Sequence, residues 1–176
     1  MHLTPAMRDF ILHWGEMGAR WGVNRSVAQV HALLFLSPRP LPADEIAETL
    51  SIARSNVSTA IRELQGWKLV KVSRELGDRR DHFTTLTDMF DLARAVVEGR
   101  REREFEPTME ALREVREAAE ADGATPEEVQ ARIADMLEVM EMFDAWYRDI
   151  ARLPRSTQVA MLKAGGALAR LLPKAG

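Results

Sequence analysis

Six polar side chains between residues 54 and 62 have the types and the spacing needed to contact duplex DNA. They are Arg54, Ser55, Asn56, Ser58, Thr59 and Arg62. Arginine donates two parallel N–H groups to guanine or phosphate, and amide and hydroxyl groups hydrogen-bond the other base edges. A helix face that is merely exposed to solvent more often carries Glu and Lys. The only such residue near this stretch is Glu63, directly after it. The pattern indicates a helix face that reads DNA.

The stretch from Leu41 to Leu64 has the apolar spacing of a helix-turn-helix. Its first helix offers Ile46, Ala47 and Leu50, and Ile52 falls in the turn. Its second helix offers the buried face Val57, Ile61 and Leu64, at i, i+4 and i+7. Small and medium apolar residues at this spacing allow two helices to cross closely. The polar side chains described above then face outward on the second helix.

A β-hairpin is predicted directly after the second helix. Gly66 is expected to end that helix, and Leu69-Val70 to begin the first strand. A polar turn over residues 76–80 separates this strand from a second one around Phe83. Arg79 and Arg80 lie in the turn, where they are expected to reach a minor groove beside the helix. The hairpin is therefore predicted to be a wing.

The rest of the chain is expected to be helical. Thr4, Asn24 and Asp88 are typical N-caps, and Pro107 is expected to interrupt the helical pattern. The expected further helices cover approximately residues 4–21, 25–36, 42–50, 87–103, 107–121, 125–152 and 154–172. The fold class is thus mainly α with a small β-hairpin wing. We expect a winged helix-turn-helix domain over residues 1–103 and a helical dimerisation and possible effector region over residues 104–176.

Composition and charge limit the classes of function. The chain has 176 residues, no cysteine and a net charge of −3. Residues 1–86 carry 11 basic and 9 acidic residues, whereas residues 87–176 carry 13 and 18. A locally basic region on an acidic body is compatible with DNA binding. The apolar runs are too short to span a membrane, and there is no secretory signal, so a cytoplasmic location is expected.

No enzyme, metal or cofactor site is expected. The four histidines are scattered and form no set of three or four metal ligands. Neither a phosphate-binding Gly-rich loop nor a nucleophile elbow is present.

Four segments together resemble the GbsR/MarR-type winged helix-turn-helix repressors, a family that includes choline-responsive regulators of glycine betaine genes. They are residues 18–25, 34–38, 41–64 and 77–83, and the resemblance covers roughly residues 14–105. It implies a homodimer, each subunit placing one recognition helix in a major groove of a pseudo-palindromic operator. Two positions depart from the family pattern: Ala53 stands where an N-cap Ser is common, and His82 where Tyr is usual.

The segment 125–152 carries a wide apolar stripe, which has two interpretations. The first is a dimer interface, because the stripe is too wide for a helix that is buried on one side only. The second is an effector pocket, since aromatic rings bind quaternary ammonium groups such as that of choline. The residues expected to line such a pocket are Trp14, Trp21, Phe143, Trp146 and Tyr147.

A second interpretation assigns the winged helix to a different class of protein. Winged helices also serve as protein–protein interaction modules without specific DNA binding. Such a module would carry apolar or acidic groups on the exposed helix and the wing, where this chain carries arginines and hydroxyl groups.

Overall fold

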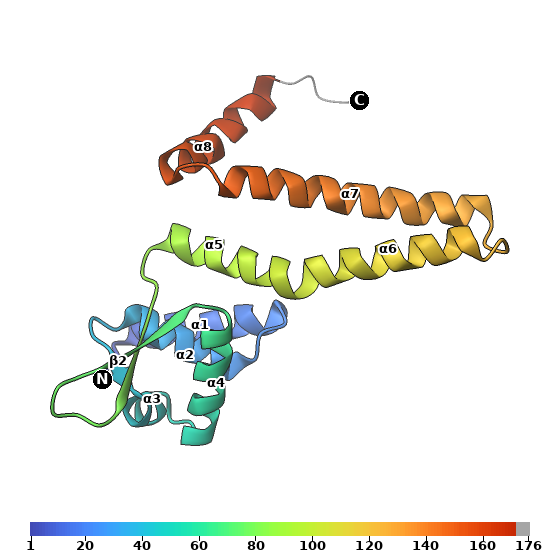
Figure 1. Cartoon of the computed structure of the whole chain (residues 1–176). Coiled ribbons are helices and arrows are strands. Elements are labelled where there is room, and N and C mark those ends of the chain that lie inside the picture. Colours follow the sequence, from blue (N-terminus) through green and yellow to red (C-terminus); the bar gives the residue numbers. More distant parts are fainter. Residues whose placement is uncertain (172–176) are drawn as a thin grey trace. The chain divides into compact units, whose positions relative to one another are not determined.

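The computed structural model describes residues 1–171, with side chains as far as residue 165. It divides into two compact units, the first covering Met1–Arg103 and the second beginning at Glu104. Both are mainly helical, and the first contains a small antiparallel sheet, which confirms the predicted fold class (Figure 1). The predicted end of the last helix, Leu172, lies outside the described residues.

The helices of the first unit begin where the sequence places their caps. The Thr4 hydroxyl accepts a hydrogen bond from the Met7 amide, and the Asn24 side chain accepts one from Ser26. Asp88 accepts two, from Phe90 and Asp91. The elements of this unit are α1 (Pro5–Arg20), α2 (Arg25–Leu36), β1 (Leu41–Pro42), α3 (Ala43–Leu50), α4 (Arg54–Gly66), β2 (Val70–Arg74), β3 (Asp81–Thr85) and α5 (Met89–Arg100).

The sheet has a third strand that the sequence did not indicate. Its order is β1-β3-β2, with both pairs antiparallel. Leu41 pairs with Phe83 on one side of β3, and Val72 pairs with Phe83 on the other. The prolines of the stretch before α3 exclude a helix there. Prolines are tolerated in an edge strand, however, so two residues of this connector pair with β3 and attach the wing to α3.

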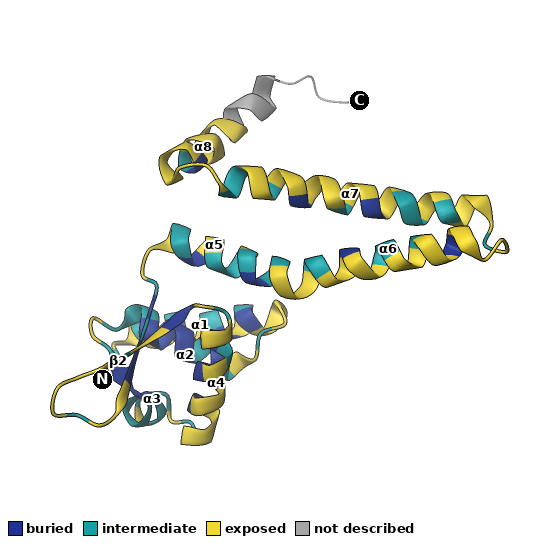
Figure 2. Ribbon diagram, in the orientation of Figure 1, coloured by how far each residue is buried: buried dark blue, intermediate teal, exposed yellow. Residues whose placement is uncertain are grey.

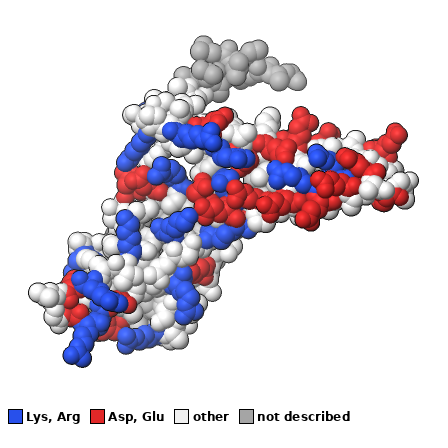
Figure 3. All heavy atoms as spheres, viewed as in Figure 1, with Lys and Arg blue, Asp and Glu red and all other residues white. Residues whose placement is uncertain are grey.

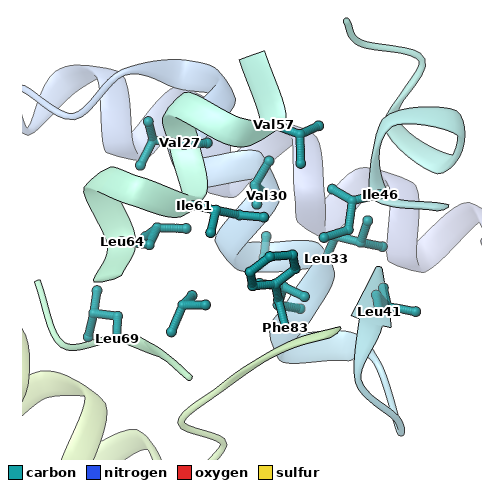
Figure 4. Close-up of a cluster of buried hydrophobic side chains, with 14 of the residues drawn as sticks. Val27, Val30, Leu33, Leu41, Ile46, Val57, Ile61, Leu64, Leu69 and Phe83 are labelled. Atoms are coloured by element: carbon teal, nitrogen blue, oxygen red, sulfur yellow. The ribbon is translucent and has the colours of Figure 1, made fainter. Parts of the chain in front are cut away.

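One apolar cluster holds the first unit together (Figure 4). The inner face of α4 and the buried side of α2 meet there, and the sheet closes the cluster at Phe83. The apolar spacing of the helix-turn-helix predicted four of the labelled residues, Ile46, Val57, Ile61 and Leu64. Those labelled in the figure are Val27, Val30, Leu33, Leu41, Ile46, Val57, Ile61, Leu64, Leu69 and Phe83.

Two glycines allow α1 to lie very close to α2. A Cβ atom on Gly18 would lie 2.5 Å from the Cβ of Ala28, and one on Gly15 would lie 2.8 Å from the Gln29 side chain. Both glycines are buried. The larger apolar residues Phe10 and Met17 of α1 are only half-buried. Close contact of the α1 backbone with side chains of α2 therefore supplies part of the packing between the two helices.

The second unit is a helical hairpin followed by a further helix. Arg101–Phe105 form a π-helical turn, and then come α6 (Glu106–Ala121), α7 (Glu127–Ala151) and α8 (Arg155–Leu171). Pro107 was expected to interrupt the helical pattern. It lies instead in the first turn of α6, where a proline removes no helical hydrogen bond, and the irregularity precedes it. Figure 2 shows that α6 and α7 are exposed over most of their length.

Candidate nucleic-acid interface

The helix α4 has one buried face and one exposed polar face. Val57, Ala60, Ile61 and Leu64 are buried. All of the side chains predicted to contact DNA are exposed, namely Arg54, Ser55, Asn56, Ser58, Thr59 and Arg62. The apolar spacing of the second helix thus places these six groups together on one solvent-facing surface. We call this set the α4 face.

The arginines of the α4 face are available for an external partner. Within the described part of the chain, no ion pair or hydrogen bond engages the side chain of Arg54 or Arg62. The Ser58 hydroxyl donates to the Arg54 carbonyl oxygen at 3.0 Å, which leaves its own oxygen free to accept. Figure 3 shows Lys and Arg side chains over α4 and over the wing of this unit.

The start of α4 is left without a side-chain cap. Ala53 is its N-cap, so no side chain accepts from the first amides, and its first turn contains no acidic residue. The unbonded N–H groups at a helix N-terminus carry partial positive charge and favour an anion. Because Ala53 stands where an N-cap Ser is common, the first turn of α4 has no side-chain cap and is slightly electropositive.

The wing consists of β2, β3 and the loop between them, and only one of its arginines is unpaired. Arg74 donates from Nε to Asp81 at 3.1 Å, and both residues lie at the ends of their strands. Arg79 is exposed, and no described residue pairs with it. The wing therefore offers two cations without a described partner, Lys71 on β2 and Arg79 in the loop.

Arg80 takes a different place from the one expected. Its guanidinium donates to Asp78 at 2.6 Å and to Asp44, near the start of α3, at 2.9 Å. The hydrogen bond from Arg80 lowers the pKa of Asp78 to about 2, and it also lowers the pKa of Asp44. Arg80 thus holds the wing loop to the helix-turn-helix, and Arg79 remains as the candidate DNA contact of the two.

His82 lies beneath this bridge. Its ring is buried, with Nδ1 3.1 Å from the Arg80 carbonyl oxygen and Nε2 3.6 Å from Asp78. The sequence analysis did not identify Asp44 or Asp78 as partners of the wing. The available signal was the Gly-Asp-Arg-Arg-Asp sequence of the loop, in which acidic and basic residues alternate closely enough to pair internally.

The end of α4 is attached to the segment that follows α5. Trp67 lies under the Arg103 guanidinium, 3.6 Å from the ring centroid, and Arg103 also donates to the Gly66 carbonyl oxygen at 3.4 Å. Lys68 donates to Glu102 at 3.0 Å. Gly66 still belongs to α4, and the left-handed residue that ends the helix is Lys68, with φ 58°. The sequence analysis missed this junction, whose partners lie more than thirty residues apart.

The predicted effector residues fall into two groups. Trp14 stacks on Phe10 at 5.5 Å and lies 6.1 Å from the buried His31 ring, whereas Trp21 is exposed. The remaining candidates lie on α7. Phe143 and Trp146 are exposed, and Tyr147 is half-buried. Trp14 therefore packs with the core cluster of the first unit. The aromatic rings exposed to solvent are that of Trp21 and those of Phe143 and Trp146 on α7.

The geometry of the first unit defines the class of protein. An α-helical pair with a three-residue turn, an exposed polar second helix and a following β-hairpin make it a winged helix-turn-helix protein. A crystal structure of a transcriptional regulator has the same fold, with a TM-score of 0.58 at 21% identity over 82% of this chain and 95% of that chain.

The sequence comparisons show which known proteins the chain is similar to. Residues 18–81 match the model of the MarR family. The HTH-type transcriptional repressor GbsR of Bacillus subtilis (strain 168) is 24% identical over 145 residues, which are 78% of this chain and 78% of the repressor. Both findings agree with the resemblance described above: the chain is similar to transcriptional regulators with a MarR-type helix-turn-helix.

The same comparisons bear on the other classes of function. The matched proteins are transcriptional regulators and not enzymes. Among the residues that the structure describes, no helix combines the length and the apolar character required to cross a membrane.

Proposed function

We propose that the protein is a homodimeric repressor of transcription that binds a pseudo-palindromic site on double-stranded DNA. Each subunit inserts the α4 face into a major groove and lays its wing along the adjacent minor groove. The observation that carries the proposal is the α4 face, where six groups suited to DNA lie exposed and two arginines lack an internal partner. The unpaired Arg79 of the wing supports it.

A stripe of apolar side chains on α7 supports the homodimer. Met136, Val139, Phe143 and Trp146 recur at intervals of three and four residues, the spacing of the seam of a coiled coil. Phe143 is 57% exposed and Trp146 is 61% exposed. Large apolar side chains gathered on one exposed face mark an interaction surface. We call these four residues the α7 stripe and propose that a second copy of the chain covers it.

The dimer explains how the protein would repress. Two α4 helices about 34 Å apart fit successive major grooves on one side of the duplex, and a protein bound there excludes other proteins from a promoter. The similarity to a repressor, GbsR, supports repression over activation. A ligand that changes the separation of the two α4 helices would release the DNA.

We also propose that choline, or a related quaternary ammonium compound, is the effector. On α7, Phe143 and Trp146 are exposed in the single chain and suited to bind it by cation–π attraction, so the ligand would compete with the second copy of the chain for the α7 stripe. Calorimetry with millimolar choline should show heat for the parent and less heat for Trp146→Ala, and choline should weaken operator binding. An absence of heat together with unchanged operator affinity would remove this part of the proposal.

The competing class is a winged-helix module that binds protein. The composition of the α4 face favours DNA, because it holds arginines, hydroxyl groups and an amide but no large apolar side chain. A gel shift with the promoter upstream of the chain's own gene decides between the classes. A shift at low salt supports the repressor, whereas no shift at low salt favours the interaction module.

Substitutions on the α4 face test the proposal residue by residue. Arg62→Ala and Asn56→Ala should each weaken operator binding by ~1–3 kcal/mol per subunit and relax sequence specificity. Arg79→Ala should lower affinity with a smaller loss of specificity. Arg94→Ala is the matched control, because it removes an exposed, unpaired arginine from α5. Operator affinity equal to the parent in all three variants would refute the assigned face.

A further inference from the structure

The loop of the wing carries an apolar side chain that the folded unit does not use. Leu76 is fully exposed, the most exposed of the large apolar residues in the described part of the chain. It lies in a tight turn that is closed by the Asp78 amide, which donates to the Glu75 carbonyl oxygen at 3.2 Å. Gly77, with φ 87°, follows it in this turn. The backbone therefore fixes Leu76 at the tip of the hairpin, pointing into solvent.

The wing loop is held in place. Arg80 joins Asp78 in the loop to Asp44 in α3, and Arg74 joins the facing ends of β2 and β3 through Asp81. These contacts attach the tip to the same helix-turn-helix that presents α4. A side chain at the tip therefore keeps a defined position relative to the α4 face.

The chemistry of the tip combines one apolar group with one available cation. Arg74 and Arg80 are engaged by carboxylates, which leaves Arg79 as the unpaired cation, three residues from Leu76. Glu75 adds a negative charge beside the tip. An apolar side chain accompanied by an arginine suits the minor groove, whose walls are deoxyribose and whose floor attracts a cation.

We propose that Leu76 is an apolar wedge that enters the minor groove and packs against the deoxyribose walls beside Arg79. This inference rests on the proposed function, because it requires the wing to lie along DNA. Leu76 then contributes affinity by burying apolar surface, whereas Arg79 contributes by neutralising a phosphate or the groove potential. The wedge also makes binding depend on how easily the base step beneath it opens, so flexible pyrimidine–purine steps are preferred there.

The two contributions differ in their dependence on salt, and this difference provides the test. Operator affinity is measured at several salt concentrations for the parent, Leu76→Ser and Arg79→Ala. Leu76→Ser should bind about tenfold more weakly at every salt concentration, because it loses apolar burial without losing charge. Arg79→Ala should reduce the slope of log affinity against log salt by about 1 per subunit, and thus by about 2 for the dimer. Because Leu76 has no role in the core, both variants should melt at the temperature of the parent.

Three controls sharpen the experiment. Leu76→Met keeps an apolar side chain of similar reach and should restore parental affinity. Val72→Ser removes another exposed apolar group of the wing, from β2 and not from the tip, and should bind as the parent does. Glu75→Gln removes the neighbouring charge and should tighten binding.

The outcomes distinguish the wedge from the broader proposal. Parental affinity for Leu76→Ser, or a loss that disappears at high salt, overturns the wedge while DNA binding stands. If the parent itself fails to bind its promoter at low salt, the proposed function fails first. Replacing the flexible base step beneath the tip by a stiff one should weaken DNA binding by the parent and leave DNA binding by Leu76→Ser unaffected. Equal effects on the two proteins would also contradict the wedge.

Discussion

The two units of the molecule bury apolar side chains to very different extents. The first unit gathers side chains from five helices and three strands into one cluster. In the described part of the second unit, the only buried apolar residues are Met109, Ala119 and Leu137. The first unit therefore has a core of its own, whereas the second exposes much of the surface that would stabilise it. This difference is why we propose that a second copy of the chain covers the second unit.

The largest expected effect comes from adding charge to the α7 stripe. Trp146→Glu places a carboxylate where we propose that a second copy packs, and aromatic residues at the centre of an interface often dominate its affinity. We expect self-association to weaken about 1,000-fold, as measured by analytical ultracentrifugation. The helix-turn-helix unit should stay folded, because its core lies elsewhere.

A matched substitution on α7 tests whether position matters. Glu138→Gln changes charge on the same helix outside the stripe and should leave the association unchanged. A dimer of parental strength in Trp146→Glu would mean that the second unit does not depend on this partner contact, and the contrast between the units would lose its explanation.

The next effect concerns the core of the first unit and its response to pH. Burial lowers the pKa of His31 from 6.5 to about 4, so the folded state keeps the ring neutral. The unfolded chain takes up a proton first as the pH falls through 6.5, and stability is lost from there down to about pH 4. The full loss is about 3 kcal/mol.

Urea unfolding across this pH range measures the effect. His31→Gln should remove this part of the pH dependence, whereas His13→Gln, on the exposed side of α1, should retain it. If His31→Gln shows the same acid loss as the parent, the buried ring is not its source.

A smaller effect is expected at the start of α4. Ala53→Ser supplies the missing cap and should raise the free energy of unfolding by about 1 kcal/mol. Ala53→Asp should raise it similarly through the cap and the helix dipole. Only the aspartate should also weaken operator binding, since it places a carboxylate beside the phosphates. Unchanged unfolding in both variants would show that the bare helix start carries no cost.

The smallest effect is expected where Trp67 meets Arg103. The exposed guanidinium over the ring contributes about 0.5–1 kcal/mol, so Arg103→Ala should lower the unfolding free energy by that amount. Arg94→Ala, which removes an unpaired arginine of α5, is the control and should have no effect. A loss in the control equal to that in Arg103→Ala would point to net charge as the cause.

Local signals in the sequence predicted most of the first unit. Capping residues such as Thr4 and Asp88 act on amides two or three positions away, so neighbouring residues reveal them. The spacing of Val57, Ile61 and Leu64 likewise assigned the buried and exposed sides of α4, because helical periodicity is local. The exposed α4 face followed from that assignment.

The features that sequence reasoning missed depend on distant partners. The bridge from Arg80 to Asp44 spans 36 positions, and the bond from Arg103 to Gly66 spans 37. The need for glycine at position 18 is visible only in the folded structure, where Ala28 lies against it. The strand at Leu41 exists because β3 is there to pair with it. Such contacts are decided by the tertiary fold and not by neighbouring residues.

The contact of α1 with α2 through Gly18 has a consequence for signalling. At Gly18 the backbone of α1 lies directly against the short Ala28 side chain, so α1 slides along α2 less easily than it would over a layer of long flexible side chains. α2 in turn shares the core cluster with α4. We therefore expect a displacement applied to α1 to reach α4 as a tilt of the whole unit, without repacking of its interior.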